Sequence, residues 1–521
     1  MNESEVTVAR LSDIGDGEMK EISVEGVEVL LARINGECFA VGAHCTHYGA
    51  PLVEGALVGD RIICPWHHAC FNAKNGELLE PPALDALPSF PVKIDGDEIL
   101  ITLSDDSSDR GNPGMAERDQ GVDDRTIAII GAGAAGYSAA QALREFKFQG
   151  RIVMISREDR SPYDRPNLSK DYLQGRAEPE WMPLRSDDFF EQHEIEMLRP
   201  KEVERVDASS KSIEFTDGTR LVYDCLLVAS GSSPRRLDLA NSDLENIFVL
   251  RDFDQADELI KRCETAKRVV VVGASFIAME AAASLRQRGL EVTVVAPDGI
   301  PFERILGDEI GGMFKVLHKG HGVEFRLETS IQGFEQSGEK VDVLLGSGER
   351  LAADLVLLGI GVVPETGFLS GVEIHQDGSV IVDEFLCAGE DVYVAGDIAT
   401  FPDSSTSELI RIEHWRFAMQ QGRAAAYNMA HGYKKAFKAI PFFWTTQFDA
   451  TLNYVGHARQ WDRILIDGDV DAQEFLAFYF EHDHVKAVAG MGRDRALAIA
   501  EEVMRCEPLA SYERFVEALN A

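Results

Sequence analysis

Two cysteines and two histidines recur at short spacing near the start of the chain. Cys45-Thr-His47 is followed by Cys64-Pro-Trp-His67. Two thiolates and two imidazoles can bind one zinc ion tetrahedrally, or a [2Fe–2S] cluster with both cysteines on one iron and both histidines on the other. Each segment supplies one cysteine and one histidine and so can reach both irons, which favours the iron–sulfur centre. By spacing, these four residues are the ligands, and His68 is expected to be an extra histidine.

The residues around these ligands resemble those of a known family. The stretches CTHYGAPLVEG and CPWHHACFNAKNGE are similar to the two cluster-binding loops of Rieske proteins. Where high-potential members of that family carry a loop-bridging cystine and two hydroxyl groups, this chain has Ala50 with Trp66, and Ala69 with Phe71. Fewer donors to the cluster disfavour its reduced form, so the resemblance implies a potential at the low end of the Rieske range.

Two glycine turns, each after a buried strand and before a helix, predict two dinucleotide sites. The first turn, GAGAAG, follows the strand TIAII and contains Gly131, Gly133, Ala134, Ala135 and Gly136. Glu158, after the next strand RIVMIS, is placed to bind ribose hydroxyls. The helix N-terminus then faces the pyrophosphate. The second turn begins at Gly273, with Ser275 and Ala278 in place of glycines. Its next strand ends before Ala296 and Asp298, and no arginine cluster follows immediately, which favours NADH over NADPH.

Several further stretches resemble the two-dinucleotide flavoprotein reductases, the group of ferredoxin and glutathione reductases. These are LLVASGSSP, LVLLGIGVVPET, VYVAGDIA and SPYDRPNLSKDYL. The resemblance implies FAD at the first site, with contacts from Arg165, Lys170, Val203, Ala229, Gly231, Arg251, Asp397 and Glu413. It implies NAD(P)H as substrate at the second, with contacts from Gly273, Ser275, Phe276, Ile277, Glu280, Asp298 and Gly361.

One absence and two more motifs narrow the subclass. No cysteine lies between 126 and 224, so electrons do not pass through a disulfide beside the flavin. IEHWRFAMQQGRAAA and IPFFWTTQFD resemble the Rieske-bearing members of the apoptosis-inducing-factor branch, which implies that His414, Trp415 and Trp444 lie by the flavin. In that family a Lys–Glu pair lies beside the flavin and the nicotinamide. The resemblance therefore implies catalytic roles for Lys170 and Glu280.

The expected fold is multidomain. It comprises an all-β Rieske domain, two α/β Rossmann-like dinucleotide-binding domains and a C-terminal α+β domain. The predicted boundaries are 1–103 for the Rieske domain, 104–125 for a flexible linker, 126–250 with 385–437 for FAD, 251–384 for NAD(P)H, and 438–521 for the C-terminal domain. The linker sequence is polar and is expected to let the cluster move between flavin and partner.

Composition limits the location and the partners. The 521 residues carry a formal net charge of -37, which repels phosphate backbones and argues against nucleic acid. No apolar run long enough for a membrane span occurs, and the acidic N-terminus lacks the features of a secretory signal or transit peptide. We expect a cytoplasmic monomer or homodimer.

The expected activity is electron transfer from NAD(P)H through FAD to the Rieske cluster. The onward acceptor is an unidentified protein or small molecule, such as a ferredoxin or an oxygenase component. Two alternatives stay open at this point. One is a redox-sensing interaction protein like the signalling apoptosis-inducing factors, and the other is a zinc-stabilised module fused to a reductase.

Overall fold

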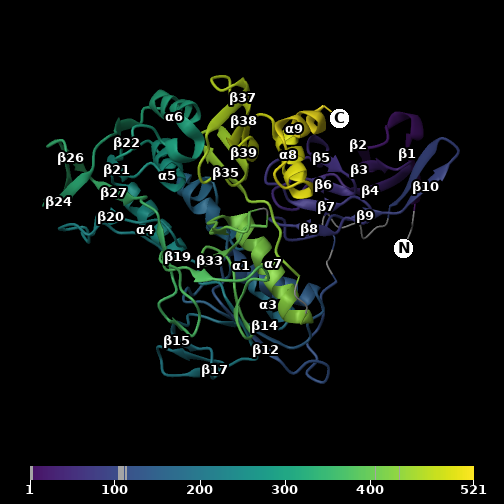
Figure 1. The fold of residues 1–521 in the computed structure, drawn as a ribbon, viewed down its shortest axis with the longest axis horizontal. Helices are drawn as coiled ribbons and strands as arrows, with labels where there is room; N and C mark the ends of the chain where they lie inside the picture. The colour runs from purple at the N-terminus through teal and green to yellow at the C-terminus, as the bar shows by residue number, and fades with distance from the viewer. Residues whose placement is uncertain (1–3, 104–110, 112–113, 405, 433–434, 521) are drawn as a thin grey trace.

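Four folded units follow one another along the chain. The computed structural model describes residues 4–103, 111, 114–404, 406–432 and 435–520. Figure 1 shows the N-terminal β domain and the second dinucleotide-binding domain on opposite sides of the C-terminal domain, with the first dinucleotide-binding domain below them. The predicted multidomain fold, with its all-β, α/β and α+β parts, is confirmed.

The N-terminal domain contains three antiparallel sheets. The alternation of Glu98–Leu103, in which Ile99, Ile101 and Leu103 are buried, gives each strand one core face. One sheet has the order β1 (Ser4–Arg10), β11 (Glu98–Leu103) and β10 (Val92–Asp95). A second has the order β2 (Met19–Val24), β3 (Val27–Ile34), β4 (Glu37–Gly42) and β9 (Ser89–Phe90). The third sheet, which carries the Cys/His segments at its end, contains β5 (Ala56–Val58), β6 (Arg61–Ile63), β7 (Cys70–Asn72) and β8 (Leu78–Glu80).

The first dinucleotide-binding domain is built on a mainly parallel sheet whose central strands are buried on both faces, as the apolar run of Thr126–Ile130 requires. Its strand order is β14 (Ile195–Leu198), β13 (Arg151–Ile155), β12 (Thr126–Ile130), β18 (Cys225–Val228), β32 (Val392–Val394) and the antiparallel β31 (Cys387–Gly389). Helices α1 (Ala134–Glu145) and α7 (Trp415–His431) pack against each other beside this sheet. A Cβ on Gly422 of α7 would lie 2.1 Å from the Ala135 carbonyl oxygen, so only glycine permits this approach.

The second dinucleotide-binding domain repeats the arrangement. Its parallel sheet has the order β20 (Ile247–Phe248), β27 (Leu355–Leu358), β21 (Arg268–Val272), β22 (Glu291–Val295) and β23 (Glu324–Arg326). A meander covers one side and contains β24 (Ile331–Ser337), β25 (Lys340–Leu345) and β26 (Arg350–Ala353). The helices are α4 (Phe253–Cys263), α5 (Phe276–Gln287) and α6 (Glu303–Gly320).

The C-terminal domain is a five-stranded antiparallel sheet with two helices. The strand order is β35 (Phe442–Gln447), β36 (Ala450–Gly456), β39 (His484–Met491), β38 (Glu474–Glu481) and β37 (Arg463–Asp469). Helix α8 (Asp494–Cys506) lies between this sheet and the N-terminal domain, and α9 (Tyr512–Leu519) packs on α8.

Two predicted boundaries differ from the strand pairing. Within 251–384, β29 (Leu369–Ser370) pairs with β15 (Val203–Asp207), and β30 (Val380–Ile381) pairs with β33 (Ala399–Pro402). These strands therefore belong to the first dinucleotide-binding domain, which resumes earlier than 385. Conversely, β20 belongs to the second sheet although it precedes 251. Apolar runs mark strands but not the sheet they join, which explains the difference.

Residues of the predicted linker 104–125 that the structure describes form hydrogen bonds with the neighbouring domains. Residues 104–110 and 112–113 lie outside the described residues. Gly111 donates to the Ala86 carbonyl at 2.8 Å, Ala116 to Arg144 at 2.9 Å and Asp119 to Gln149 at 2.8 Å. The part after 114 is thus hydrogen-bonded to the first dinucleotide-binding domain, a contact that the expectation of a flexible linker did not include.

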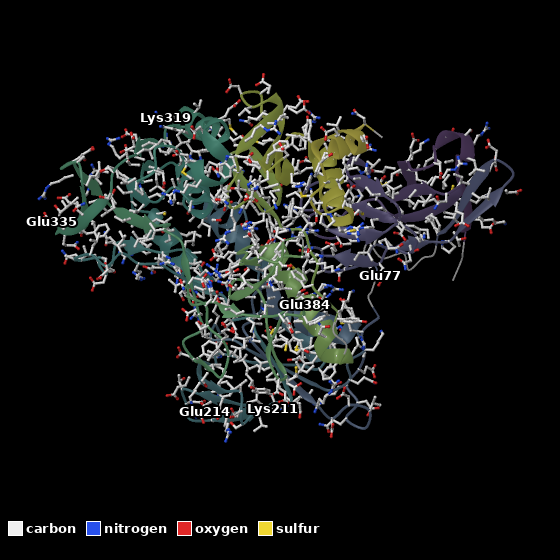
Figure 2. All side chains as sticks on the ribbon, viewed as in Figure 1. Glu77, Lys211, Glu214, Lys319, Glu335 and Glu384 are labelled. Atoms are coloured by element: carbon white, nitrogen blue, oxygen red, sulfur yellow. The ribbon has the colours of Figure 1, made fainter. Side chains whose placement is uncertain are left out.

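Charged side chains project from every domain. Figure 2 shows Glu77 on the N-terminal domain, Lys319 and Glu335 on the second dinucleotide-binding domain, and Glu384 on the first. Within the described part of the chain, no helix combines the length and apolar character needed to cross a bilayer.

Candidate functional site

The two Cys/His segments form loops of the same construction. Cys45 donates its backbone N–H to the Ala50 carbonyl at 2.9 Å, and Cys64 donates to the Ala69 carbonyl at 2.8 Å. The first loop follows β4, and the second joins β6 to β7, whose pairing sets Ile63 opposite Cys70. Each loop therefore presents one thiol and one imidazole to the same point from a fixed turn.

The four side chains meet as two like pairs. The Nδ1 atoms of His47 and His67 face each other at 3.2 Å. The thiols of Cys45 and Cys64 share a hydrogen bond, which raises the pKa of Cys45 and lowers that of Cys64. Removal from water lowers the pKa of His47 to about 3 and also lowers that of His67, so both rings are neutral at pH 7.

This pairing fits a binuclear cluster better than a single ion. Two thiolates on one iron and two neutral imidazoles on the other match the two pairs. His68, the extra histidine, points elsewhere. It is fully buried, stacks on Phe442 with ring centroids 4.1 Å apart, and hydrogen-bonds Glu501.

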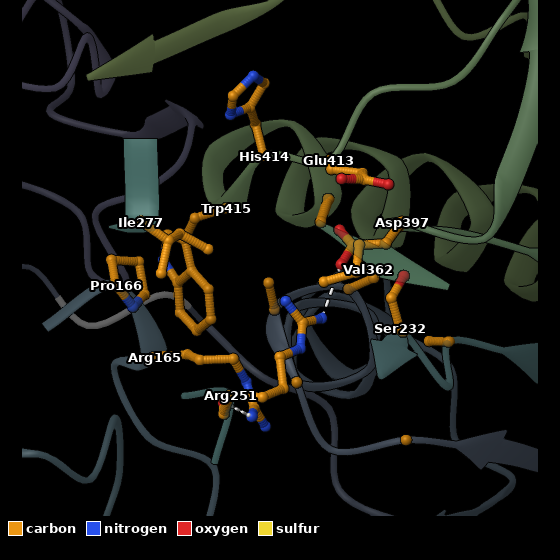
Figure 3. A pocket seen from close by; sticks show the side chains of 18 of the residues that line it. Arg165, Pro166, Ser232, Arg251, Ile277, Val362, Asp397, Glu413, His414 and Trp415 are labelled. Carbon is orange, nitrogen blue, oxygen red and sulfur yellow. Dashed lines mark hydrogen bonds and ion pairs between the residues drawn. The ribbon is translucent and has the colours of Figure 1, made fainter. Parts of the chain in front are cut away.

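A large cavity of about 810 Å³ lies between the two dinucleotide-binding domains and the C-terminal domain. It collects most of the residues predicted for FAD and NAD(P)H. These are Gly131, Gly133, Ala134, Ala135, Glu158, Arg165, Lys170, Val203, Ala229, Gly231, Arg251, Ser275, Phe276, Ile277, Glu280, Gly361, Asp397, Glu413, His414, Trp415 and Trp444. Figure 3 shows side chains that line this cavity, among them Arg251 reaching toward Asp397.

Three predicted residues lie outside the cavity lining. A Cβ on Gly136 would lie 1.9 Å from the Gly131 carbonyl oxygen, and one on Gly273 would lie 2.4 Å from the Gly359 carbonyl oxygen. These glycines permit close backbone packing behind the two turns. Asp298 instead pairs with Arg304 at 3.3 Å, and it is Arg304 that lines the cavity.

The first glycine turn fits a pyrophosphate. A Cβ on Gly133, at the N-cap of α1, would meet nothing within 4 Å, so the backbone there borders open space. The first-turn N–H groups of α1 face that space and favour an anion. The cavity thus has the size and the donor set for FAD.

Charged side chains around the flavin part of the cavity are held by one another. Arg251 Nη2 lies 2.7 Å from Asp397 Oδ2, and Arg165 Nη2 lies 2.9 Å from Glu158 Oε1. Tyr163 Oη donates to the other oxygen of Glu158 at 2.7 Å. Because each group is fixed, the two carboxylates predicted to contact FAD, Glu158 and Asp397, keep their orientation.

Lys170 and Glu280 meet as the resemblance implied. Lys170 Nζ lies 2.8 Å from Glu280 Oε2, and Glu280 is 4% exposed. Ser169 Oγ donates to the same oxygen at 2.6 Å. The pair bridges helix α5 of the second domain and residues 161–173, the SPYDRPNLSKDYL stretch, here called the flavin loop.

A chain of donors supports the other oxygen of Glu280. Thr445 Oγ1 donates to Glu280 Oε1 at 2.7 Å, Gln447 Nε2 donates to Thr445 Oγ1 at 3.1 Å, and His318 Nε2 lies 2.8 Å from Gln447 Oε1. Sequence reasoning did not identify these residues as functional. Thr445 and Gln447 lie within the quoted IPFFWTTQFD stretch, and their alternation on one strand was the available signal.

Thr445→Val is expected to slow flavin reduction by NAD(P)H several-fold. The isosteric change removes one hydrogen bond from Glu280 and leaves the Gln447 amide buried without its acceptor, at a cost of about 1–3 kcal/mol. Stopped-flow flavin absorbance and thermal unfolding measure the two effects. Thr446→Val is the matched control, because Thr446 bonds Thr451 in an exposed position. Equal behaviour of the two variants would contradict the role of Thr445.

The cluster loops abut the flavin cavity. The His67 ring lies 4.5 Å, centroid to centroid, from Trp444, which lines the cavity. Tyr48, beside His47, hydrogen-bonds Asp164 in the flavin loop. The predicted cluster and flavin sites are therefore neighbours within the folded chain.

Comparison with known proteins agrees with this geometry. Residues 125–422 match the pyridine nucleotide-disulphide oxidoreductase family, residues 4–91 the Rieske [2Fe-2S] domain, and residues 442–514 the reductase C-terminal family. The Rieske match supports the iron–sulfur interpretation over the zinc one, and the reductase match indicates FAD and NAD(P)H.

Similar proteins include reductases and an apoptosis-inducing factor. The chain is 38% identical to apoptosis-inducing factor 3 of Mus musculus over 96% of this chain and 84% of that protein. The crystal structure of a ferredoxin reductase from Rhodopseudomonas palustris is 31% identical, with a TM-score of 0.71 over 75% of this chain and 96% of that one. Putidaredoxin reductase, in covalent complex with putidaredoxin, is 28% identical with a TM-score of 0.71 over 76% and 99%.

The fold, the cavity and these matches agree on an NAD(P)H-dependent flavoprotein reductase. The chain belongs to the pyridine nucleotide-disulphide oxidoreductase family, in a form that carries an N-terminal Rieske [2Fe-2S] domain.

Proposed function

We propose that the chain passes electrons from NAD(P)H through its flavin and its Rieske centre to an external one-electron acceptor. When bound, FAD and the cluster supply the redox chemistry: one NAD(P)H gives two electrons and releases one proton, and two equivalents of acceptor each take one electron. The observation that carries the proposal is the position of the ligand His67 against Trp444, a wall of the flavin cavity.

The residues of the chain orient the groups at the cavity wall and neutralise the negative charge that develops there. Glu280, held by Ser169 and Thr445, fixes the Lys170 ammonium at the cavity wall. A fixed cation there favours the negative charge that hydride uptake brings to the flavin. Removal from water keeps His414 neutral, with its pKa lowered to about 4, and its ring stacks on Phe443 at 4.6 Å.

The acceptor we propose is a ferredoxin-type protein or an oxygenase component. Support comes from similar proteins, which include a ferredoxin reductase and a putidaredoxin reductase joined to putidaredoxin. The likeness to apoptosis-inducing factor 3 supports a second candidate, a redox-sensing interaction protein with slow NADH oxidation. Fast reduction of ferricyanide or cytochrome c favours the first, and a long-lived charge-transfer complex favours the second.

Anaerobic rapid mixing with excess NADH or NADPH tests the electron path. We expect the flavin absorbance to bleach first and the cluster to become reduced second, at a rate that does not depend on protein concentration because both sites lie in one chain. A cluster that stays oxidised beside a fully reduced flavin, with either nucleotide, would refute the path.

A further inference from the structure

Arg416 joins three domains through one buried side chain. It is the second residue of α7 and directly follows Trp415 of the flavin cavity. Its Nε donates to the Pro81 carbonyl at 3.0 Å and its Nη2 to Glu80 at 2.9 Å, both in the Rieske domain. Its Nη1 donates to Glu501 of the C-terminal helix α8 at 2.8 Å. Arg416 is 1% exposed.

Both acidic partners of Arg416 make further contacts within the interface. Glu501 also hydrogen-bonds His68, the residue after the ligand His67. Glu80 accepts from Gln420 of α7 at 2.6 Å and pairs with Arg61. The network therefore runs from the flavin-domain helix to the loop that holds the cluster.

An apolar contact lies beside this network. Ala56, Ile63 and Cys70 of the cluster-bearing sheet pack on Ala498 of α8, and all four are nearly fully buried. Arg61 continues the polar contact by pairing with Glu502 of the same helix at 3.1 Å. The Rieske domain is thus seated on α8 by both packing and paired charges.

The buried charges favour a single orientation of the Rieske domain against the other domains. Burial by itself would raise the pKa of Glu501, but Arg416 and His68 more than offset this and bring it to about 2, so the carboxylate is ionised at pH 7. Breaking a buried pair on one side leaves an uncompensated charge and costs about 3–5 kcal/mol. A shifted or rotated Rieske domain would lose the partners of Arg416 in this way.

We infer that Arg416 is a positioning residue that fixes the Rieske domain in its docked orientation, so that electrons pass between the flavin and cluster sites without release of the domain. This replaces the swinging domain expected from the polar 104–125 segment. The second half of the inference rests on the proposed function, whereas the docking half does not. Only electrons cross the interface, and no atom is transferred.

The test compares Arg416→Met with Arg423→Met in the full-length holoenzyme. Arg423 is on the same helix and also forms an ion pair, with Glu145 at 2.7 Å, but both partners belong to the first dinucleotide-binding domain. Glu80→Gln probes the same contact from the Rieske side and serves if Arg416→Met does not fold. Flavin reduction and cluster reduction are followed separately by stopped flow, and domain docking by solution X-ray scattering and hydrogen exchange of 64–68 and 497–502.

For Arg416→Met and Glu80→Gln we expect flavin reduction within about twofold of wild type and cluster reduction slower by roughly tenfold to a hundredfold, because small displacements at a reacting geometry have effects of that order. The radius of gyration and the exchange of both segments should rise. Arg423→Met should change none of these.

Two outcomes overturn the inference. One is unchanged scattering, exchange and cluster reduction in both variants. The other is wild-type scattering that already requires an undocked Rieske domain. If the wild-type cluster accepts no electrons but scattering and exchange respond as expected, the proposed electron path fails while the docking role of Arg416 stands.

Discussion

Cys64→Ser is expected to abolish the [2Fe–2S] signal of the reduced protein while FAD stays bound. A serine hydroxyl replaces the thiolate of one Cys pair, and a soft thiolate ligand is what an iron–sulfur centre requires. The flavin cavity is lined by residues from other domains, so it keeps its glycine turn and its Arg251–Asp397 pair. Electron paramagnetic resonance measures the cluster, and the flavin spectrum of the same sample measures FAD.

Cys38→Ser is the matched control for that loss. Cys38 is a half-buried thiol on β4 of the same domain, outside the two ligand loops. We expect its variant to keep both cofactors. Loss of FAD together with the cluster in Cys64→Ser would contradict the separation of the two sites.

Lys170→Met is expected to slow flavin reduction by NAD(P)H about a hundredfold, the usual effect of removing one preorganised charge from an active site. The variant also leaves Glu280 buried with Ser169 and Thr445 as its remaining donors. Unfolding should therefore require about 3 kcal/mol less. FAD should be retained, because the glycine turn predicted to bind its pyrophosphate, residues 131–135, does not include Lys170. Anaerobic stopped flow and thermal unfolding measure the two effects.

A double variant separates stability from chemistry at this pair. Lys170→Met with Glu280→Gln removes both charges, so unfolding should return close to wild type while flavin reduction stays slow. Lys211→Met controls for loss of a paired lysine elsewhere, since Lys211 pairs with Asp391 outside the cavity. An unchanged reduction rate in Lys170→Met would remove this residue from the nicotinamide site.

Local motifs were sufficient to predict much of the fold and of the candidate site. The spacing of Cys45, His47, Cys64 and His67 depends on two short loops, and the glycine turns depend on a strand and the helix after it. Such patterns are read within a few residues, so the all-β and α/β domains and most of the cavity lining could be predicted. The pairing of Lys170 with Glu280 could be predicted only from the family resemblance, because the two residues are far apart in sequence.

Other long-range contacts between domains could not be predicted. His68 adjoins a ligand in sequence, but its partner Glu501 lies in the last domain. Arg416 was part of a quoted stretch, yet nothing local to it indicates Glu80 or Pro81. The domain to which β29 and β30 belong was misassigned for the same reason, since strand pairing is decided by tertiary contact.

The burial of the Arg416 contacts has a consequence for the influence of ionic strength. Salt screens exposed charges beyond about 8–10 Å but affects buried pairs much less. Electron transfer between the flavin and the cluster should therefore be nearly insensitive to added salt. Delivery to a separate partner instead takes place over the surface of a chain with a formal net charge of -37, where counterions compete with any basic partner. On the proposed route, transfer inside the chain should therefore be nearly independent of the ionic composition of the surroundings, whereas delivery to the partner should vary with it.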